Sequence, residues 1–153
     1  MSPMPRDIQY LTVQDHLWIN LQVSGRSQPF NFATLEEATY LQYSYGGSND
    51  VLAQAARYGA GFGVKSPFAE GNEATAFVGL LSFLRLNGFE IELPDSKGGD
   101  LLATLADNGV AALKKIVRPD HHDHEMTVSG VVNEILSAFP KSVKKLAKAA
   151  PTA

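Results

Sequence analysis

The sequence predicts an all-α protein, a compact bundle of helices around one central helix. Three observations support this fold class. Apolar residues recur at three- and four-residue spacing along most of the 153 residues, few stretches alternate with period two, and helix-capping residues precede several apolar segments. Hydrophobic residues make up 44% of the chain and there is no cysteine, so we expect a core that needs neither disulfides nor a cysteine-bound metal.

The first half of the chain predicts three helices. Thr12 and Asp15 have the spacing of a capping box, and an expected buried stripe follows them: Val13, Leu17, Trp18 and Leu21. A second helix is expected from Thr34, with Glu37 completing its capping box, to Tyr45. Asn49 or Asp50 is expected to cap a third helix, in which small residues allow close helix packing: Ala53, Ala56, Ala60 and Gly63.

A loop over residues 66–72 precedes the strongest helical pattern. Pro67 disfavours helical geometry in the residue before it, and Gly71 permits conformations that other residues avoid. From Glu73 to the Asn87-Gly88 stop, the apolar residues cover so wide a face that we expect this helix at the centre of the core.

The second half predicts shorter elements. Residues 89–93 alternate apolar and acidic side chains and predict a short extended piece ending at Pro94. Helices are expected over 100–106, 110–117 and 127–139, and a basic amphipathic helix over 141–149. Residues 114–153 carry 7 basic and 4 acidic side chains, against 6 and 12 in residues 1–113, so the C-terminal end is a distinct cationic segment.

Composition excludes several functional classes. No apolar segment approaches the ~20 residues of a membrane span, and the N-terminus lacks a signal-peptide pattern, so a cytoplasmic protein without membrane contact is expected. A net charge of −3 argues against nucleic acid as a partner. The basic C-terminal residues also lack the interleaved aromatic side chains on which bases stack.

The Gly71-Asn72 pair before the central helix has a composition suited to phosphate. Free backbone N–H groups and the helix dipole favour an anion there, the Asn72 amide can donate to oxygen, and Glu70 could bind Mg²⁺. The alternative is an ordinary turn in which Asn72 caps the helix.

The segment SPFAEGNEATA (66–76), followed by FLRLNGF (83–89), resembles the Fic/Doc (Fido) signature HPFxDGNKRTA and FLxxNGY. The segment from Tyr10 to Leu17 is similar to the start of the death-on-curing (Doc) branch. The resemblance covers residues 10 to about 109 and implies a helical Fic/Doc domain over residues 10–117. Residues 1–9 are then an N-terminal extension and 118–153 a C-terminal helical extension with a basic tail.

The resemblance implies a protein that uses ATP and Mg²⁺ to transfer AMP or phosphate to a hydroxyl of a target protein. It places Ser66 at the position of the general-base histidine and Phe68 at the loop anchor. Glu70 takes the position of the magnesium ligand, while Gly71 and Asn72 match the phosphate-binding pair. The Lys-Arg pair is replaced by Glu73 and Ala74, and Thr75 and Ala76 are retained.

These replacements predict impaired catalysis. A serine hydroxyl is a poor base, and a positioned base is worth about 10²- to 10⁴-fold in rate. Exchanging Lys-Arg for Glu73-Ala74 removes positive charge and adds a negative one, so ATP and Mg²⁺ binding should be weakened. The leading hypothesis is a pseudoenzyme of toxin-antitoxin ancestry that binds a protein partner, such as an antitoxin or a former target. The alternatives are an active AMP- or phosphotransferase and a purely structural loop without a ligand.

Other polar and aromatic residues have simpler interpretations. His121, His122 and His124 are interpreted as an exposed turn, with metal binding and a pH-sensitive contact as alternatives. His16 is interpreted as a structural residue. The second helix region is rich in aromatic residues, which suit the core or, where exposed, a protein interface: Phe30, Phe32, Tyr40, Tyr43 and Tyr45.

Overall fold

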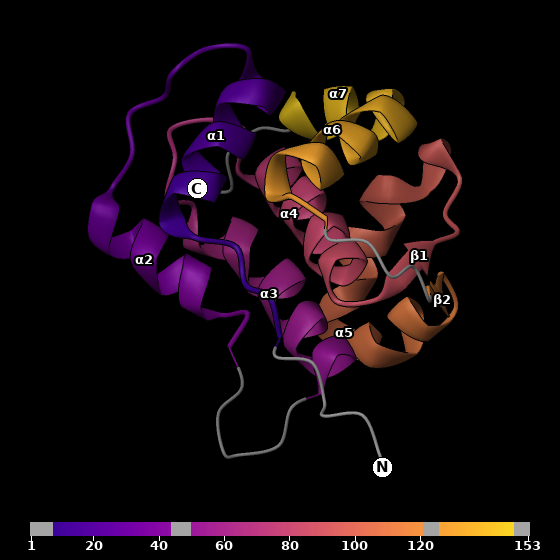
Figure 1. Cartoon of the computed structure of the whole chain (residues 1–153). Helices are drawn as coiled ribbons and strands as arrows, with labels where there is room; N and C mark the ends of the chain where they lie inside the picture. The colour runs from indigo at the N-terminus through magenta and orange to yellow at the C-terminus, as the bar shows by residue number, and fades with distance from the viewer. Residues whose placement is uncertain (1–7, 44–49, 121–125, 149–153) are drawn as a thin grey trace.

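The computed structural model describes residues 8–43, 50–120 and 126–148. Within them, seven α-helices pack together, with a small antiparallel sheet of two strands at the edge of the molecule, which confirms the mostly helical prediction (Figure 1). The helices are α1 (Val13–Ser24), α2 (Phe32–Tyr40), α3 (Val51–Lys65), α4 (Asn72–Leu86), α5 (Gly98–Lys114), α6 (Val128–Ala138) and α7 (Pro140–Ala147). Strand β1 (Phe89–Ile91) is followed by the 3-10 helix η1 (Asp95–Lys97), and β2 (Val117–Pro119) by α6.

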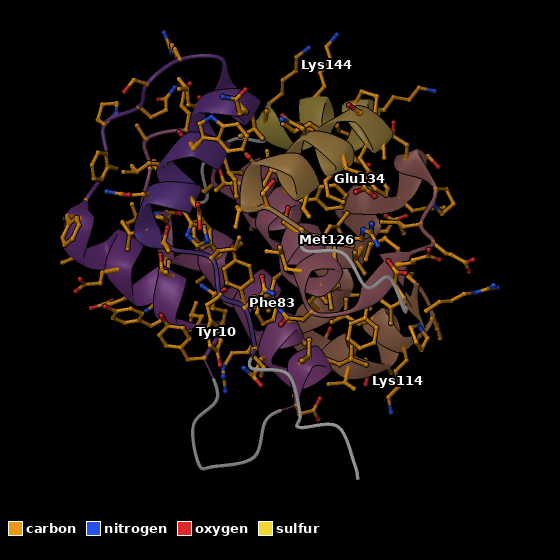
Figure 2. The ribbon with its side chains drawn as sticks, in the orientation of Figure 1. Tyr10, Phe83, Lys114, Met126, Glu134 and Lys144 are labelled. Atoms are coloured by element: carbon orange, nitrogen blue, oxygen red, sulfur yellow. The ribbon has the colours of Figure 1, made fainter. Side chains whose placement is uncertain are left out.

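Helix α4 occupies the centre of the molecule, as predicted. Every residue from Ala74 to Leu84 is buried, and α1, α3, α6 and α7 all pack against it (Figure 1). Gly79 lets Tyr58 of α3 approach closely, because the Tyr58 hydroxyl occupies the space that a Cβ would need. Aromatic rings extend the core toward the N-terminal segment, where Tyr10 stacks on Phe83 at a centroid distance of 6.2 Å (Figure 2).

The small-residue face of α3 allows α5 to pack closely against it. A Cβ built on Gly109 would lie 2.6 Å from the Cβ of Ala56, so only glycine fits at this crossing. A kink at Asn108, where φ is −142° and ψ is 48°, divides α5 into two helical segments. They correspond to the two short helices predicted for residues 100–106 and 110–117, except that Val117 belongs to β2.

Local capping explains where the first three helices begin. Thr12 and Asp15 form the predicted capping box of α1, and the Asp50 side chain caps α3. The predicted start of α2 at Thr34 is wrong: the Asn31 side chain accepts from the Thr34 N–H, so the helix begins at Phe32 and its last residue is Tyr40. The predicted stripe of α1 is wrong at Leu21, which is 41% exposed, whereas Val13, Leu17 and Trp18 are partly buried against the core. The most buried residues of the helix are His16, Ile19 and Asn20.

The C-terminal helices share the core of the rest of the chain. β2 pairs with β1 in antiparallel register, with Glu90 opposite Arg118. Helix α7 is amphipathic, as predicted: Val143 and Leu146 are buried, while its lysines point outward, as Lys144 does in Figure 2. Asp95 of η1 fixes its start by accepting from the Lys141 and Ser142 N–H groups, both at 2.9 Å, and these bonds lower the Asp95 pKa. No helix in the described part of the chain is long and apolar enough to cross a bilayer.

Candidate functional site

The predicted motif loop connects α3 to the N-terminus of α4. It begins at Ser66, which ends α3 in the left-handed conformation with φ 48° and ψ 56°. It ends at Gly71, the N-cap of α4, with φ 78°. Pro67, Phe68, Gly71 and Asn72 are buried, while Ala69 and Glu70 are exposed, so the structure places the predicted site residues around one turn of backbone.

Ser66 stands where the resemblance places a base, but its hydroxyl has another partner. Its Oγ donates to the Gly63 carbonyl oxygen at 2.9 Å and so satisfies an acceptor at the end of α3. Ser66 is the one non-glycine residue with positive φ in the described segments. Because its hydroxyl already donates to the end of α3, Ser66 has no feature that would make it a base.

The Asn72 side chain holds the loop together. Its Oδ1 accepts from the Phe68 N–H at 2.9 Å, and its Nδ2 donates to the Phe68 carbonyl oxygen at 2.8 Å. Asn72 is 7% exposed and Phe68 5%. Asn72 is the first residue of α4 and its side chain does not cap the helix, so the capping interpretation is wrong in detail although the residue is a structural brace.

A second brace comes from α1, which sequence reasoning missed. The Asn20 Nδ2 donates to the Glu70 carbonyl oxygen at 2.9 Å and to the Thr75 Oγ1 at 3.2 Å, and the Thr75 hydroxyl donates to the Gly71 carbonyl oxygen at 2.7 Å. A Cβ on Gly71 would lie 3.1 Å from the Asn20 Nδ2. The available signal was a polar residue, Asn20, beside Ile19 in an otherwise apolar segment.

A third brace is an isolated antiparallel bridge between Phe30 and Phe68. The Asn31 N–H donates to the Pro67 carbonyl oxygen and the Ala69 N–H donates to the Pro29 carbonyl oxygen, both at 2.9 Å. The segment before α2 is thereby fixed to the loop, a long-range pairing that no local pattern predicts.

The charges around the start of α4 are unfavourable for a nucleotide. Glu70 is exposed and pairs with Arg26 at 3.3 Å, Glu73 is half-buried in the first turn, and Ala74 is fully buried. Ala74 therefore has no side-chain group to offer a phosphate in place of the arginine. The first-turn N–H groups of α4 have no side-chain cap and carry the positive end of the helix dipole, but the nearby side-chain charges sum to −1.

The same residues offer Mg²⁺ a single carboxylate. Magnesium in nucleotide sites takes one or two carboxylates together with phosphate oxygens, and Glu70 offers one, which forms a solvent-exposed ion pair with Arg26. Across residues 8–43, 50–120 and 126–148, no three histidine or acidic side chains gather as metal ligands. His121, His122 and His124 lie outside the described residues.

His16 has the character of a structural residue, as expected from the sequence. It is fully buried, its Nδ1 lies 2.8 Å from the Thr12 carbonyl oxygen, and its Nε2 lies 2.5 Å from the Tyr58 hydroxyl. The Thr12 oxygen can only accept, so Nδ1 carries the proton and Nε2 accepts from Tyr58. Burial lowers the His16 pKa from 6.5 to about 4, so the ring is neutral near pH 7 and locked in the core.

Comparison with known proteins gives no match to a family model, to a curated protein or to a solved structure. The Fic/Doc resemblance of residues 66–89 therefore stays a prediction from the sequence.

Proposed function

We propose that this chain is a Fic/Doc-like protein without transferase activity that acts by binding a protein partner. The observation that carries the proposal is that the side chains at the supposed catalytic positions hold the loop itself. The Ser66 hydroxyl donates to the Gly63 carbonyl oxygen, and the Oδ1 and Nδ2 of Asn72 are both hydrogen-bonded to the backbone of Phe68. The loop then serves to seat α4, and the interaction with a partner takes place elsewhere.

The chemistry of the loop supports the loss of transfer. Attack by a target hydroxyl needs a group that accepts its proton, and neither Ser66 nor the neutral, buried His16 offers one at the loop. Transfer from ATP also needs positive charge at the phosphates, and the side chains here supply two carboxylates and one guanidinium.

An exposed aromatic surface on α2 supports protein binding. Phe32 is 59% exposed and Tyr40, two helical turns later on the same side, is 42% exposed. Phe30, just before the helix, is 45% exposed. Aromatic side chains are enriched at the centres of protein interfaces, so we assign partner binding to this α2 face, defined by Phe30, Phe32 and Tyr40.

One observation favours a second candidate, an active transferase that still binds phosphate at the loop. The uncapped start of α4 offers backbone N–H groups, and the Arg26 guanidinium lies beside Glu70, although the side-chain charges around them sum to −1. Under this alternative, an active transferase would use Arg26 in place of the missing Lys-Arg pair.

A transfer assay separates the two candidates. Purified protein is incubated with Mg²⁺, a cell lysate and ATP labelled at either the α- or the γ-phosphate, so that AMP transfer and phosphate transfer are distinguished. We expect no labelled protein above background. Labelling that disappears in Glu70→Gln, an exposed position whose change should leave the fold intact, would establish an active enzyme and overturn the proposal.

Partner binding needs its own test. A partner isolated by cross-linking to the wild-type chain should lose at least about tenfold in affinity with Phe32→Ser/Tyr40→Ser, because hot-spot aromatic residues each contribute more than about 1 kcal/mol. Val64→Ser is the matched control, since Val64 is 80% exposed on α3 and lies outside the α2 face. Equal affinity for all three chains would remove the α2 face from the proposal.

A further inference from the structure

Helix α7 presents a row of lysines to solvent that neither the motif loop nor the α2 face uses. They lie at the i, i+3, i+4 and i+7 positions, so they share one side of the helix, and all four are exposed. The opposite side, with Val143 and Leu146, is buried in the core. At about 1.5 Å of rise per residue, the row is roughly 10 Å long. The α7 lysine stripe is defined by these residues: Lys141, Lys144, Lys145 and Lys148.

The α7 lysine stripe holds most of the unpaired positive charge of the described residues. The cations that form ion pairs elsewhere are Arg26, Lys65, Arg85, Lys97 and Arg118. Arg57 donates to two backbone carbonyl oxygens. Within residues 8–43, 50–120 and 126–148, no lysine of the stripe forms an ion pair, although Lys141 lies near the Asp95 carboxylate. The two other lysines in these segments without an ion pair are Lys114 and Lys115, at the end of α5.

The needs of the helix itself do not account for the whole stripe. Cations in the last turn of a helix interact favourably with its dipole, which suits Lys144 and Lys145. Lys141 lies in the first turn, where the dipole disfavours a cation. Like charges at i, i+3 and i+4 also repel one another, and the buried side of α7 prevents the helix from turning to separate them. An anionic partner would relieve this repulsion.

The shape and surroundings of the stripe limit the kind of anion. Its charges are spread along a line, which fits several carboxylates in sequence better than one phosphate group. The exposed residues of α7 include no aromatic side chain on which a base could stack and no large apolar side chain that could enter a bilayer. The chain without these four lysines has a net charge of −7, since −3 minus 4 is −7. A long duplex or a membrane would extend past the stripe and be repelled by that charge, whereas a short acidic segment would not.

We propose that the α7 lysine stripe binds a short acidic segment of a partner protein, whose Asp or Glu carboxylates pair with Lys144, Lys145 and Lys148. Lys141 contributes least, because Asp95 already lies near it. The inference adds the chemistry of a second contact to the partner binding proposed above. It rests on that function only in taking the occupant to be a protein, and it needs neither the Fic/Doc assignment nor the α2 face.

A peptide of eight glutamates is the probe, titrated into the isotope-labelled full chain and followed by NMR. At low salt, the amide signals of Lys144, Lys145 and Lys148 should shift saturably, with a dissociation constant of about 1 mM or lower. The shifts should disappear at about 0.5 M salt, because exposed ion pairs are screened. No saturable shift on α7, or saturable shifts only elsewhere on the chain, would overturn the proposal.

Two further probes test the other large anions at the same low salt. A DNA duplex several helical turns long and vesicles of phosphatidylcholine with phosphatidylserine should both bind more weakly than the glutamate peptide. The reason is that each extends over the acidic surface beyond the stripe. If either binds as tightly as the peptide or more tightly, the stripe is a nucleic-acid or membrane contact and the proposal is wrong.

Paired variants locate the binding. Lys144→Gln/Lys145→Gln should weaken the peptide about tenfold, because two of the ion pairs are removed. Lys114→Gln/Lys115→Gln is the matched control: it changes the net charge equally at exposed positions of α5, and Figure 2 shows Lys114 and Lys144 far apart. It should change the affinity by less than about twofold. Equal losses in both variants would mean that the peptide responds to overall charge, which overturns the proposal.

The same spectra show whether each variant is folded, through the signals of the buried helix α4. If Lys144→Gln/Lys145→Gln does not fold, Lys148→Gln replaces it, with an expected loss of about threefold. An unchanged affinity in that variant counts against the proposal. Failure of the peptide to bind leaves the partner test at Phe32 and Tyr40 unaffected, so it removes the α7 contact without removing the proposed function.

Discussion

The motif loop and the segment that leads into α2 differ in how their polar groups are paired. In the loop, the Asn72 amide is bonded at both ends and Ser66 is bonded to the helix it terminates. In the segment before α2, the Gln28 amide nitrogen is buried and has no partner among the described residues. In the loop that resembles an active site, the polar side chains are thus hydrogen-bonded within the loop or to the end of α3, whereas the segment before α2 keeps an unpaired donor. Sequence motifs locate the first kind of region, and only packing reveals the second.

The largest effect on stability is expected from removing the Asn72 side chain that holds the loop together. Asn72→Ala leaves the buried N–H and C=O of Phe68 unpaired, so we expect a loss of about 3 kcal/mol in the free energy of unfolding. Urea unfolding measures it. Asn72→Asp, which keeps the acceptor for the Phe68 N–H, should lose about half as much. A loss below about 0.5 kcal/mol for Asn72→Ala would show that the brace is unimportant.

The pH dependence of stability tests whether His16 is a buried structural group. Its pKa is 6.5 in the unfolded reference and about 4 when folded, so below pH 6.5 the unfolded chain binds a proton that the folded chain does not. Stability is therefore complete above pH 6.5 and falls toward pH 4, by about 2 kcal/mol between pH 6.5 and 5. Urea unfolding at several pH values measures the slope, and His16→Gln should flatten it. An equal slope in that variant would assign the titration to other groups.

The matching change at Gln28, in the segment before α2, should have the opposite sign. Gln28→Met replaces an unpaired buried amide by an apolar side chain of similar shape, so we expect a gain of up to about 1 kcal/mol in the free energy of unfolding. Thermal and urea unfolding are the measurements. Gln14→Met, at an exposed position of α1, should stay within about 0.5 kcal/mol of the wild type. A clear loss for Gln28→Met would mean that its nitrogen is paired in solution.

The smallest effect is expected at the surface of the loop. Arg26 and Glu70 form an ion pair whose side chains are 71% and 56% exposed. Arg26→Ala should therefore change stability by less than about 0.5 kcal/mol, and the difference should vanish at high salt. A larger loss, measured by urea unfolding, would give Arg26 a structural role in holding the loop.

The sequence predicted those features that depend on neighbouring residues. The α1 capping box at Thr12 and Asp15, the cap at Asp50, the stop at Asn87-Gly88 and the buried central helix are all set by local spacing and composition. The loop position followed from Pro67 and Gly71 for the same reason. The start of α2 was misplaced because Thr34 and Asn31 both offer caps, and only the fold selects between them.

The bracing of the candidate site could not be predicted in this way. Asn20 reaches the loop across 50 residues, and the Phe30–Phe68 bridge joins segments 38 residues apart, since 68 minus 30 is 38. The isolation of the Gln28 nitrogen depends on every neighbouring element at once. Such contacts carry no local periodicity, so a sequence motif indicated where the loop lies but not what its side chains do.

Amide hydrogen exchange at Phe68 is the most direct test of the claim that the loop is closed on itself. Its N–H is bonded to the Asn72 Oδ1 and buried, so the account predicts slow exchange, near the rate set by global unfolding, with no change when Mg²⁺ and ATP are added. Exchange at the rate of an exposed loop, or protection that develops only with Mg²⁺ and ATP, would contradict the account and identify the loop as a working nucleotide site.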